Sequence, residues 1–270
     1  MTAIAPRRDD LGEEVLIAGE VQRIVSLVPN LSELLWSWGL ADRVVGVTQW
    51  CVAPPDGFPH AHRVRGTKNP DVAAIVALAP DLVIANEEEN RQLDVERLRT
   101  AGLAVHVTRV RTLADLPGSL HRLAGALGVD DAASRLVAAI EQALATCEQP
   151  GRRRRVACAV WRDDPEAGGE EEGWWLLGRA TYAGDLLDRI GLEVLPADPE
   201  GRYPRCRLAE LRALDPGVVL LPDEPYAFGP ADAAELGRVG LRAVLVDGMD
   251  LWWWGPRTPG AIARLAQLAR

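Results

Sequence analysis

The stretch IVALAPDLVI (residues 75–84) and its counterpart LRALDPGVVL (residues 211–220) decide the fold of this chain. Each predicts the end of a helix, a turn that contains proline, and a buried strand, in that order. Each strand then runs into carboxylates, with Glu88 after the first copy and Glu224 after the second. A pattern that occurs once in each half of the chain predicts two lobes of similar architecture.

Outward from these two stretches, short apolar runs alternate with helical segments. Strands are predicted at Val44–Val47, Leu82–Ala85 and Ala104–Thr108, and helices are predicted to begin at Asn30 and at Asn69-Pro70. Strands that alternate with helices indicate parallel sheets. The predicted fold class is therefore α/β, with two Rossmann-like lobes.

A long helix is predicted between the two halves. Apolar residues recur at helical spacing from Asp130 to Cys147, and no Gly or Pro interrupts them. The segment predicts one helix of about 18 residues, roughly 27 Å long, that bridges the lobes. The predicted organisation is an N-terminal extension (1–20), an N-terminal lobe (21–129), the linking helix (130–149) and a C-terminal lobe (150–270).

Composition excludes several classes of protein. The net charge of −9 argues against nucleic acid as a partner. An arginine cluster at residues 152–155 is the one basic exception, and we interpret it as a solvated start of the second lobe. No run of about 18 apolar residues is present, so no membrane insertion is expected. The four cysteines form no CxxC pair, so neither a zinc site nor a disulfide framework is predicted.

The first 20 residues carry charges where an export signal needs an apolar core, for example Arg7, Arg8, Asp9 and Asp10. The expected location is therefore the cytoplasm, or the periplasm or cell exterior if a leader has been removed.

Several motifs resemble one known family. In the first half these are RIVSLVPN (23–30), GTKNP (66–70), PDLV (80–83) and EEN (88–90), and in the second PDEPY (222–226) and WGPR (254–257). Together they resemble the helical-backbone metal receptors, the cobalamin-type or class III periplasmic binding proteins, over residues of about 22 to 270. The resemblance implies two Rossmann-like lobes joined by one rigid helix. It also implies a bulky chelate bound between them, with cobalamin or another corrinoid foremost and haem or a ferric siderophore as alternatives.

The resemblance has one departure that concerns the membrane permease. In transport-linked members, each lobe offers a glutamate seven residues before its proline turn. Here those positions are Ala73 and Ala209, so permease docking is in doubt, although Glu210 and Asp71 stand near them as possible substitutes. A substrate-binding component of a cobalamin or iron importer is kept as an alternative to a cytoplasmic carrier, store or sensor.

Tryptophan is the main candidate for contact with a flat macrocycle, because it offers a broad apolar face and one N–H donor. The chain has nine tryptophans but only two phenylalanines. Three places at strand ends are predicted to line the ligand cleft, namely Trp50, Trp161 and the pair Trp253 and Trp254. Trp36 and Trp38 lie in a helical segment and are predicted to be core residues.

Polar ligand contacts are predicted beside these tryptophans. In the first lobe the candidates are Cys51, Thr67, Lys68, Glu88, Glu89 and Asn90; in the second they are Tyr182, Glu224, Tyr226 and Arg257. The alternative is that they belong to solvated loops and helix caps.

The sequence does not favour an enzyme. It has no GxSxG, P-loop or GxGxxG motif, and no metal ligand or catalytic residue is predicted. Cys51 with a nearby histidine is the only pair that resembles a nucleophile and base. A monomer that binds a small-molecule chelate is expected, with no required cofactor, and a protein-interaction or sensor module that uses the tryptophan-rich cleft is the alternative.

Overall fold

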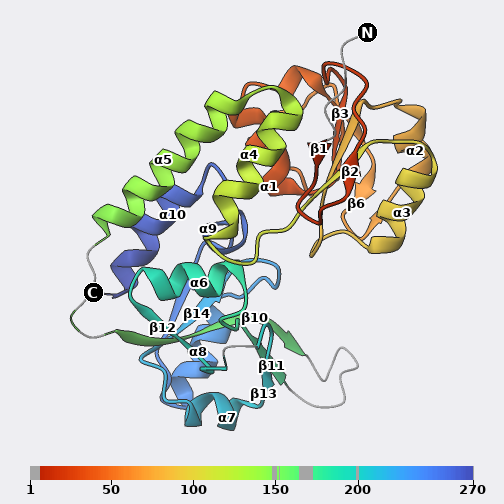
Figure 1. The fold of residues 1–270 in the computed structure, drawn as a ribbon. Coiled ribbons are helices and arrows are strands. Elements are labelled where there is room, and N and C mark those ends of the chain that lie inside the picture. Colours follow the sequence, from red (N-terminus) through yellow and green to blue (C-terminus); the bar gives the residue numbers. More distant parts are fainter. Residues whose placement is uncertain (1–6, 148–150, 152, 164–172, 199–200, 270) are drawn as a thin grey trace. The chain divides into compact units, whose positions relative to one another are not determined.

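The structure is a computed structural model, which describes residues 7–147, 151, 153–163, 173–198 and 201–269. The chain divides into two compact units. Unit 1 comprises Met1–Val110 and Ala114–Ala138, and unit 2 comprises Arg111–Leu113 and Ala139–Arg270. Each unit combines helices with a sheet whose central strands are parallel (Figure 1), which confirms the predicted α/β class.

Unit 1 is built on a five-stranded parallel sheet in the order β5-β4-β3-β8-β9. Its strands are β3 (Ile24–Ser26), β4 (Val44–Val47), β5 (His62–Arg63), β8 (Leu82–Asn86) and β9 (Val105–Thr108). Two small antiparallel pairs accompany the sheet, β1 (Arg7–Arg8) with β2 (Glu14–Val15), and β6 (Arg65–Gly66) with β7 (Asn69–Pro70). Its helices are α1 (Pro29–Ser37), the short 3-10 helix η1 (Ala41–Arg43), α2 (Val72–Ala77), α3 (Gln92–Thr100) and α4 (Asp115–Leu127).

Unit 2 has a six-stranded sheet with a parallel and an antiparallel part. The parallel part has the order β12-β10-β14-β15, and the antiparallel part continues from β10 through β11 to β13. The strands are β10 (Arg154–Asp163), β11 (Gly173–Leu176), β12 (Leu192–Leu195), β13 (Arg205–Cys206), β14 (Val218–Pro222) and β15 (Ala243–Val246). The helices are α6 (Tyr182–Arg189), α7 (Leu208–Ala213), α8 (Pro230–Arg238), α9 (Met249–Trp252), α10 (Thr258–Leu265) and the 3-10 helix η3 (Ala266–Ala269).

The central strands explain why the apolar runs of the sequence are continuous rather than alternating. All five residues of β8 are buried, and so are all five residues of β14. A parallel strand with both faces covered must be apolar on both faces, so its sequence has no polar alternate positions. The core of each unit is therefore centred on the strand of the repeated sequence pattern.

The repeated pattern has the same backbone conformation in both units. Ala79 and Asp215, which directly precede the two prolines, have φ values of 43° and 49°. An arginine at the start of the neighbouring strand region donates to the carbonyl that ends each helix. Arg23 Nη2 lies 2.6 Å from the Leu78 oxygen, and Arg155 Nη2 lies 2.7 Å from the Leu214 oxygen. The two units thus close the same turn with the same kind of side-chain contact.

The arginine cluster at the start of β10 is solvent-accessible in part, as the sequence indicated, and it also makes hydrogen bonds within unit 2. Besides Arg155, Arg153 donates to the Leu192 carbonyl at 2.9 Å, and Arg154 donates to the Leu268 carbonyl at 2.8 Å. Arg152 lies outside the described residues. The described arginines of the cluster therefore join the start of β10 to other elements of unit 2.

The predicted linking helix is present as α5 (Asp130–Thr146), one uninterrupted helix of 17 residues (Figure 1). The boundary between the units falls within it, after Ala138. The predicted end at residues 148–149 lies outside the described part of the chain. None of the helices among the described residues is long and apolar enough to cross a membrane.

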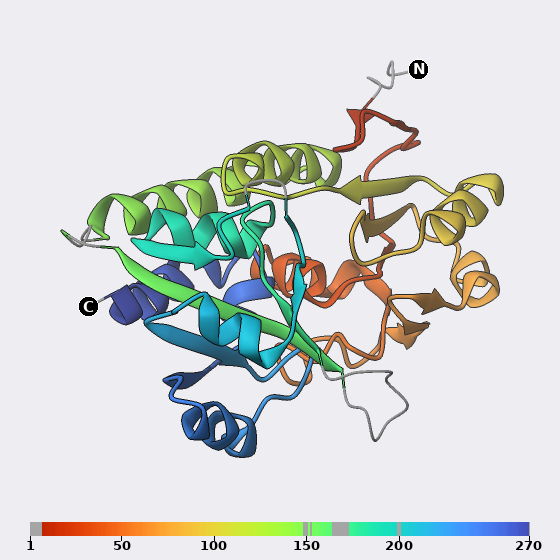
Figure 2. The same ribbon diagram turned by 90° about the horizontal axis from the view of Figure 1, so that it is seen from below.

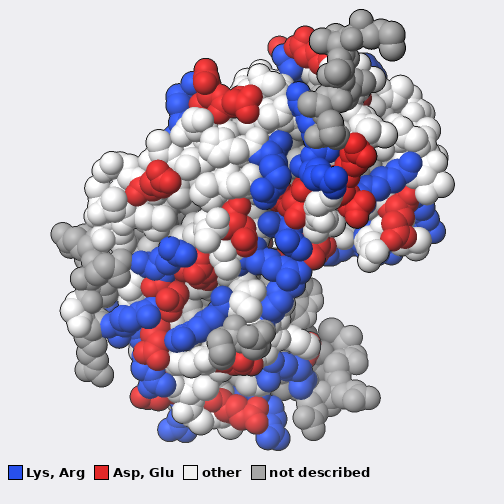
Figure 3. All heavy atoms as spheres, in the orientation of Figure 1, with Lys and Arg blue, Asp and Glu red and all other residues white. Residues whose placement is uncertain are grey.

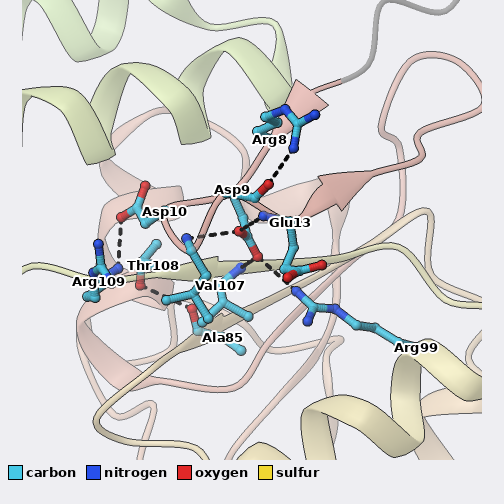
Figure 4. A network of polar contacts seen from close by, with 11 residues as sticks. Arg8, Asp9, Asp10, Glu13, Ala85, Arg99, Val107, Thr108 and Arg109 are labelled. Carbon is cyan, nitrogen blue, oxygen red and sulfur yellow. Dashed lines mark hydrogen bonds and ion pairs between the residues drawn. The ribbon is translucent and has the colours of Figure 1, made fainter.

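The segment predicted as an N-terminal extension is joined to the sheet of unit 1. Asp9 and Asp10 lie between β1 and β2 and bond to the edge strand β9 (Figure 4). The Asp10 amide donates to the Val107 carbonyl at 3.1 Å, and the Arg109 amide donates to Asp10 Oδ2 at 2.8 Å. Residues 7–15 therefore cover the edge of β9. A strand at the edge of a sheet has unpaired backbone groups, and covering them prevents pairing with another chain.

Two predicted helix starts were wrong. Helix α1 begins at Pro29, with Val28 as a cap that has no side-chain bond, so Asn30 lies inside the helix and is buried. Asn69-Pro70 forms β7, and α2 begins after Asp71, whose carboxylate accepts the Ala74 amide at 3.1 Å. In both places a local capping signal was displaced by one or a few residues, because sheet pairing and packing fix where the helix begins.

Candidate functional site

The carboxyl edge of the unit 1 sheet gathers loops from distant parts of the sequence. Because its five strands are parallel, the residues after β4, β8 and β9 emerge at the same edge, where α/β proteins bind ligands. Trp50 follows β4, Glu88 and Glu89 follow β8, and Arg109 follows β9. Trp50 is 57% exposed, which is unusual for a tryptophan and leaves much of its ring accessible.

Asn90 holds this edge together. Its side chain is buried, its Oδ1 accepts the Asn86 amide at 2.9 Å, and its Nδ2 donates to the Thr67 carbonyl at 2.9 Å. Nδ2 also lies 3.5 Å from the Leu27 carbonyl. The amide therefore fixes the loop after β8 to the β6–β7 turn, which makes Asn90 a positioning residue.

The charged residues beside Asn90 remain at the surface. Lys68 and Glu88 are exposed, and Lys68 Nζ donates to the Glu88 carbonyl at 2.6 Å. Loss of hydration raises the pKa of Glu89, which Lys68 opposes and Glu88 reinforces. Thr67 lies in the β6–β7 turn and is half-buried. These four residues form a polar rim, with three charged members, whose role in ligand contact stays a prediction.

Cys51, the candidate ligand contact and one half of the possible nucleophile–base pair, is buried. Only 2% of the residue is exposed, and Ser32 Oγ donates to Sγ at 2.9 Å. Burial raises the pKa of the Cys51 thiol, although hydrogen bonds with Ser32 and Thr48 and the charge of Arg63 lower it in part. Nucleophilic cysteines need a lowered pKa. The structure therefore gives no support to a cysteine nucleophile, and burial also disfavours direct contact between Cys51 and a ligand.

Unit 2 presents its aromatic residues beyond the parallel part of β10, the long green strand in Figure 2. Residues 154–158 pair in parallel with β12 or β14, whereas residues 159–163 pair antiparallel with β11. Trp161 lies in this extension, is 46% exposed, and meets the Tyr226 ring edge-on at 5.3 Å and 79°. Tyr226 in turn contacts Phe228 at 4.5 Å. An aromatic row thus supports an exposed indole, at a point where the register between β10 and β11 shifts.

Glu224 and Trp253 form a second polar group in unit 2. Trp253 Nε1 donates to Glu224 Oε1 at 2.7 Å, and the Arg257 guanidinium lies 5.4 Å from the Trp253 ring centre. Burial raises the pKa of Glu224, and Asp223 and Asp247 act in the same direction, whereas the Trp253 bond and Arg257 oppose it. This group joins the ends of β14 and α9, so the sequence-predicted residues Glu224, Trp253 and Arg257 are brought together.

Other predicted site residues are buried. Tyr182 lies at the start of α6 with its hydroxyl 3.0 Å from Thr258 Oγ1, and burial raises its pKa. Trp254 is buried, as is Trp253, so neither exposes a ring face to solvent. Whether these residues contact a ligand stays a prediction.

The prediction that Trp36 belongs to the core was wrong. It is 48% exposed on α1, whereas Trp38 is partly buried. The helical spacing places Leu31, Leu34 and Leu35 on the buried face of α1, so Trp36 lies on the other face.

Sequence reasoning missed Arg63, which organises the loop that carries Trp50. Arg63 Nη1 donates to the carbonyls of Thr48 and Cys51 at 3.0 and 3.1 Å. The missed signal was the short strand β5, because a two-residue strand has no periodicity. Within the described residues, no group of three or more His, Cys, Asp or Glu side chains is placed to hold a metal ion.

Charged side chains of both signs lie interspersed on the visible face of the molecule (Figure 3). The net charge of the whole chain is −9, which disfavours a phosphate-backbone partner.

Comparison with known sequences gives a consistent family. A family model described as periplasmic binding protein matches residues 24–230. The vitamin B12-binding protein of Pectobacterium atrosepticum is 26% identical over 201 residues, which are 74% of this chain and 71% of that protein. An ABC transporter substrate-binding lipoprotein of Bacillus subtilis is 26% identical over 253 residues, which are 90% of this chain and 72% of that protein.

Solved structures share the fold. A periplasmic haem-binding protein from Pseudomonas aeruginosa matches with a TM-score of 0.76 at 24% identity, covering 92% of each chain. The periplasmic vitamin B12-binding protein of Vibrio cholerae matches with a TM-score of 0.72 at 20% identity, covering 92% of this chain and 96% of that chain. These matches confirm the fold expected from the sequence motifs.

The expected cytoplasmic location is contradicted by the same comparisons. The similar proteins are described as periplasmic proteins or as a lipoprotein, and one is the substrate-binding part of an ABC transporter. The charged first residues of this chain were therefore a misleading guide to its location.

Proposed function

We propose that this chain, which belongs to the periplasmic binding protein family, binds a bulky metal chelate without converting it, and that a corrinoid such as cobalamin is its preferred cargo. Family members are binding proteins and not enzymes, in agreement with the sequence. The location that accords with the relatives is the periplasm or the cell exterior.

The observation that carries the proposal is the similarity to vitamin B12-binding proteins over three quarters of the chain. Two such proteins match over 74% and 76% of it, at 26% and 23% identity. The haem-binding proteins support the fold alone, so haem remains a ligand to be tested beside cobalamin.

The exposed tryptophans supply the physical basis for chelate binding. Trp50 in unit 1 and Trp161 in unit 2 each leave about half of the side chain open to solvent. Burying such rings against a flat apolar ligand is favourable, and the indole N–H can also bond to a peripheral amide. Lys68, Glu88 and Glu224 are proposed as polar partners of such amides.

A ligand panel tests this proposal. Cyanocobalamin, hemin and a ferric hydroxamate siderophore are titrated against the full chain, and tryptophan fluorescence and visible absorption are recorded. Cyanocobalamin is expected to quench fluorescence saturably, and Trp50→Ala is expected to weaken its binding by about 1–3 kcal/mol. Trp36→Ala is the matched control, because Trp36 is similarly exposed but lies near the C-terminal end of α1, outside the loops that follow the strands.

The possible outcomes separate the alternatives. Binding of hemin or the siderophore alone would retain a chelate carrier and reject the corrinoid. Binding of none of the three would overturn chelate binding and favour the protein-interaction module. Equal affinity of Trp50→Ala and the wild type would remove Trp50 from the site without rejecting the ligand.

We further propose that the chain delivers its cargo to an ABC permease, because one relative is described as an ABC transporter substrate-binding lipoprotein. Ala73 on α2 and Ala209 on α7 are exposed. Glu210 is also exposed beside Ala209, and its carboxylate accepts the Arg207 amide at 2.7 Å. We propose that Glu210 provides the docking charge on α7, while it also caps that helix.

The charge of Glu210 can be separated from its capping role. Glu210→Gln keeps an oxygen that accepts the Arg207 amide but removes the negative charge. This variant is expected to weaken a salt-sensitive complex with the cognate permease while cargo affinity is unchanged. A complex equally strong with Glu210→Gln would reject the docking role.

A further inference from the structure

Trp50 combines an exposed ring with an unusually well-fixed loop. The Gln49 amide donates to the Arg65 carbonyl at 2.7 Å, and the Cys51 amide donates to the Thr48 carbonyl at 3.2 Å. The ring nitrogen of Trp50 also lies close to Gly66, where an added Cβ would be only 3.2 Å from it. An exposed indole contributes little to the stability of the fold through burial. The contacts that fix its loop are therefore not explained by packing of the Trp50 ring.

Arg63 is the central contact of that loop. One nitrogen of its guanidinium, Nη1, donates to both the Thr48 and the Cys51 carbonyl, at 3.0 and 3.1 Å. These two residues lie on either side of Trp50 in the sequence. Arg63 is brought there by the pairing of β5 with β4, in which Val47 faces Arg63. A cation that bridges two carbonyls holds the intervening turn in one conformation.

The buried Cys51 thiol provides a second set of contacts for the loop. Ser32 Oγ lies 2.9 Å from both Cys51 Sγ and Ser26 Oγ, and Thr48 Oγ1 lies 3.2 Å from Sγ. These groups tie the loop to β3 and α1, which belong to the core of unit 1. The loop is thus held both through the Cys51 thiol and through the two carbonyls that Arg63 contacts.

We propose that Arg63 is a positioning residue for Trp50. By holding the two flanking carbonyls, it keeps the indole in one orientation before any ligand arrives. A rigid aromatic surface loses less conformational entropy on binding than a mobile one, so its affinity for a flat ligand is higher. The positioning itself is independent of the ligand, and only its benefit for affinity rests on the proposed chelate binding.

The first experiment uses no ligand. The chain is labelled with 5-fluorotryptophan, and the ¹⁹F resonance of Trp50 is assigned by its loss in Trp50→Phe. Arg63→Ala is expected to shift or broaden this resonance and to leave the other tryptophan signals in place. Arg63→Lys is expected to restore it in large part, because one nitrogen makes both bonds.

Arg65→Ala is the matched control for this experiment. Arg65 is a neighbouring exposed arginine whose side chain pairs with Asp71 at 3.3 Å. Its removal is expected to leave the Trp50 resonance unchanged. An unchanged Trp50 resonance in Arg63→Ala, or the same disturbance in Arg65→Ala, would overturn the positioning role.

The second experiment measures affinity with whichever of cyanocobalamin and hemin binds the wild-type chain. Arg63→Ala is expected to weaken binding by about tenfold, and to have no further effect in the Trp50→Ala background. A full additional loss in that background would show that Arg63 acts on the ligand directly and would overturn the positioning role. If neither probe binds the wild type, the proposed function fails for these ligands, while the ¹⁹F experiment still decides the role of Arg63.

Discussion

Replacing Asp9 with alanine is expected to detach the N-terminal hairpin from the sheet of unit 1. The Asp9 side chain is completely buried, and its carboxylate is the centre of the network in Figure 4. It links β1 and β2 to the edge strand β9, which leads to Thr108 and Arg109 at the carboxyl edge of the sheet. A change at Asp9 therefore tests how the edge of the candidate site is supported.

The loss in free energy of unfolding caused by Asp9→Ala can be worked out from the donor groups that lose the carboxylate as their acceptor. Oδ1 accepts the amides of Leu11 and Glu13 at 2.9 Å each, and both residues are exposed, so water can replace the carboxylate. Oδ2 accepts the buried Val107 amide at 3.3 Å, and leaving that group unpaired costs about 1–3 kcal/mol. Arg99 lies 2.8 Å from Oδ2 but is 31% exposed, so loss of this ion pair adds about 1 kcal/mol. The expected loss of stability is about 2–4 kcal/mol.

Urea unfolding followed by circular dichroism measures this loss, and hydrogen exchange of peptides that cover β9 locates it. Asp9→Ala is expected to accelerate exchange at Val107, and Asp9→Asn, which keeps one oxygen acceptor, is expected to cost less. Glu13→Ala is the control, because Glu13 contacts Asp9 through its main-chain amide and carbonyl, which the substitution keeps. A loss under about 0.5 kcal/mol together with unchanged exchange at Val107 would refute the reasoning.

Three further predictions concern buried polar groups. Burial lowers the pKa of His106, although the charges of Asp9 and Asp10 oppose this shift. The imidazole is therefore protonated more readily in the unfolded chain than in the folded one. The free energy of unfolding should consequently fall as the pH drops below about 6.5. His106→Gln should flatten that part of a stability profile measured by urea unfolding from pH 7.5 to 5, and an identical slope would contradict the assignment. Trp253→Phe removes the indole donor to Glu224 and should raise the pKa of Glu224 further, as read by carboxyl ¹³C NMR; an unchanged or lower midpoint would contradict it. Asn90→Ala should cost about 1–3 kcal/mol in urea unfolding and increase exchange in the β6–β7 turn, whereas a stable variant with an unchanged turn would show that Asn90 does not anchor it.

The architecture could be predicted from the sequence because its signals are long and local. The paired stretches at 75–84 and 211–220 predicted equivalent helix–turn–strand units, and the structure gives both the same turn, with Ala79 and Asp215 at positive φ. Helix α5 was also predictable, because 17 residues of uninterrupted periodicity leave few alternatives. Helix starts were less predictable, since capping residues compete with sheet pairing over one or two positions.

The site was predictable only in outline. Strand-end logic placed Trp50 in the loop after β4, because parallel strands send their following loops to one edge. It was wrong for Trp161, which lies within β10 and pairs with Trp175 of β11. That either residue lines a ligand cleft stays a prediction. Strand-end logic could not separate a ligand-facing polar residue from an internal anchor. Asn90 and Cys51 lie in loops of the expected kind, yet both side chains are buried and bonded within the protein.

The sequence by itself therefore determined the α/β class, the repeated helix–turn–strand pattern and the place of Trp50 after β4, because periodicity and turn chemistry act within a few residues of chain. Only the tertiary structure decided which side chains support others. Arg63 reaches the loop of Trp50 through the pairing of β5 with β4, and Asp9 reaches Val107 across 98 residues of sequence. Such contacts depend on the relative placement of distant strands, and a hydrogen bond that requires about 3 Å and a narrow range of angles leaves no periodic trace in the sequence.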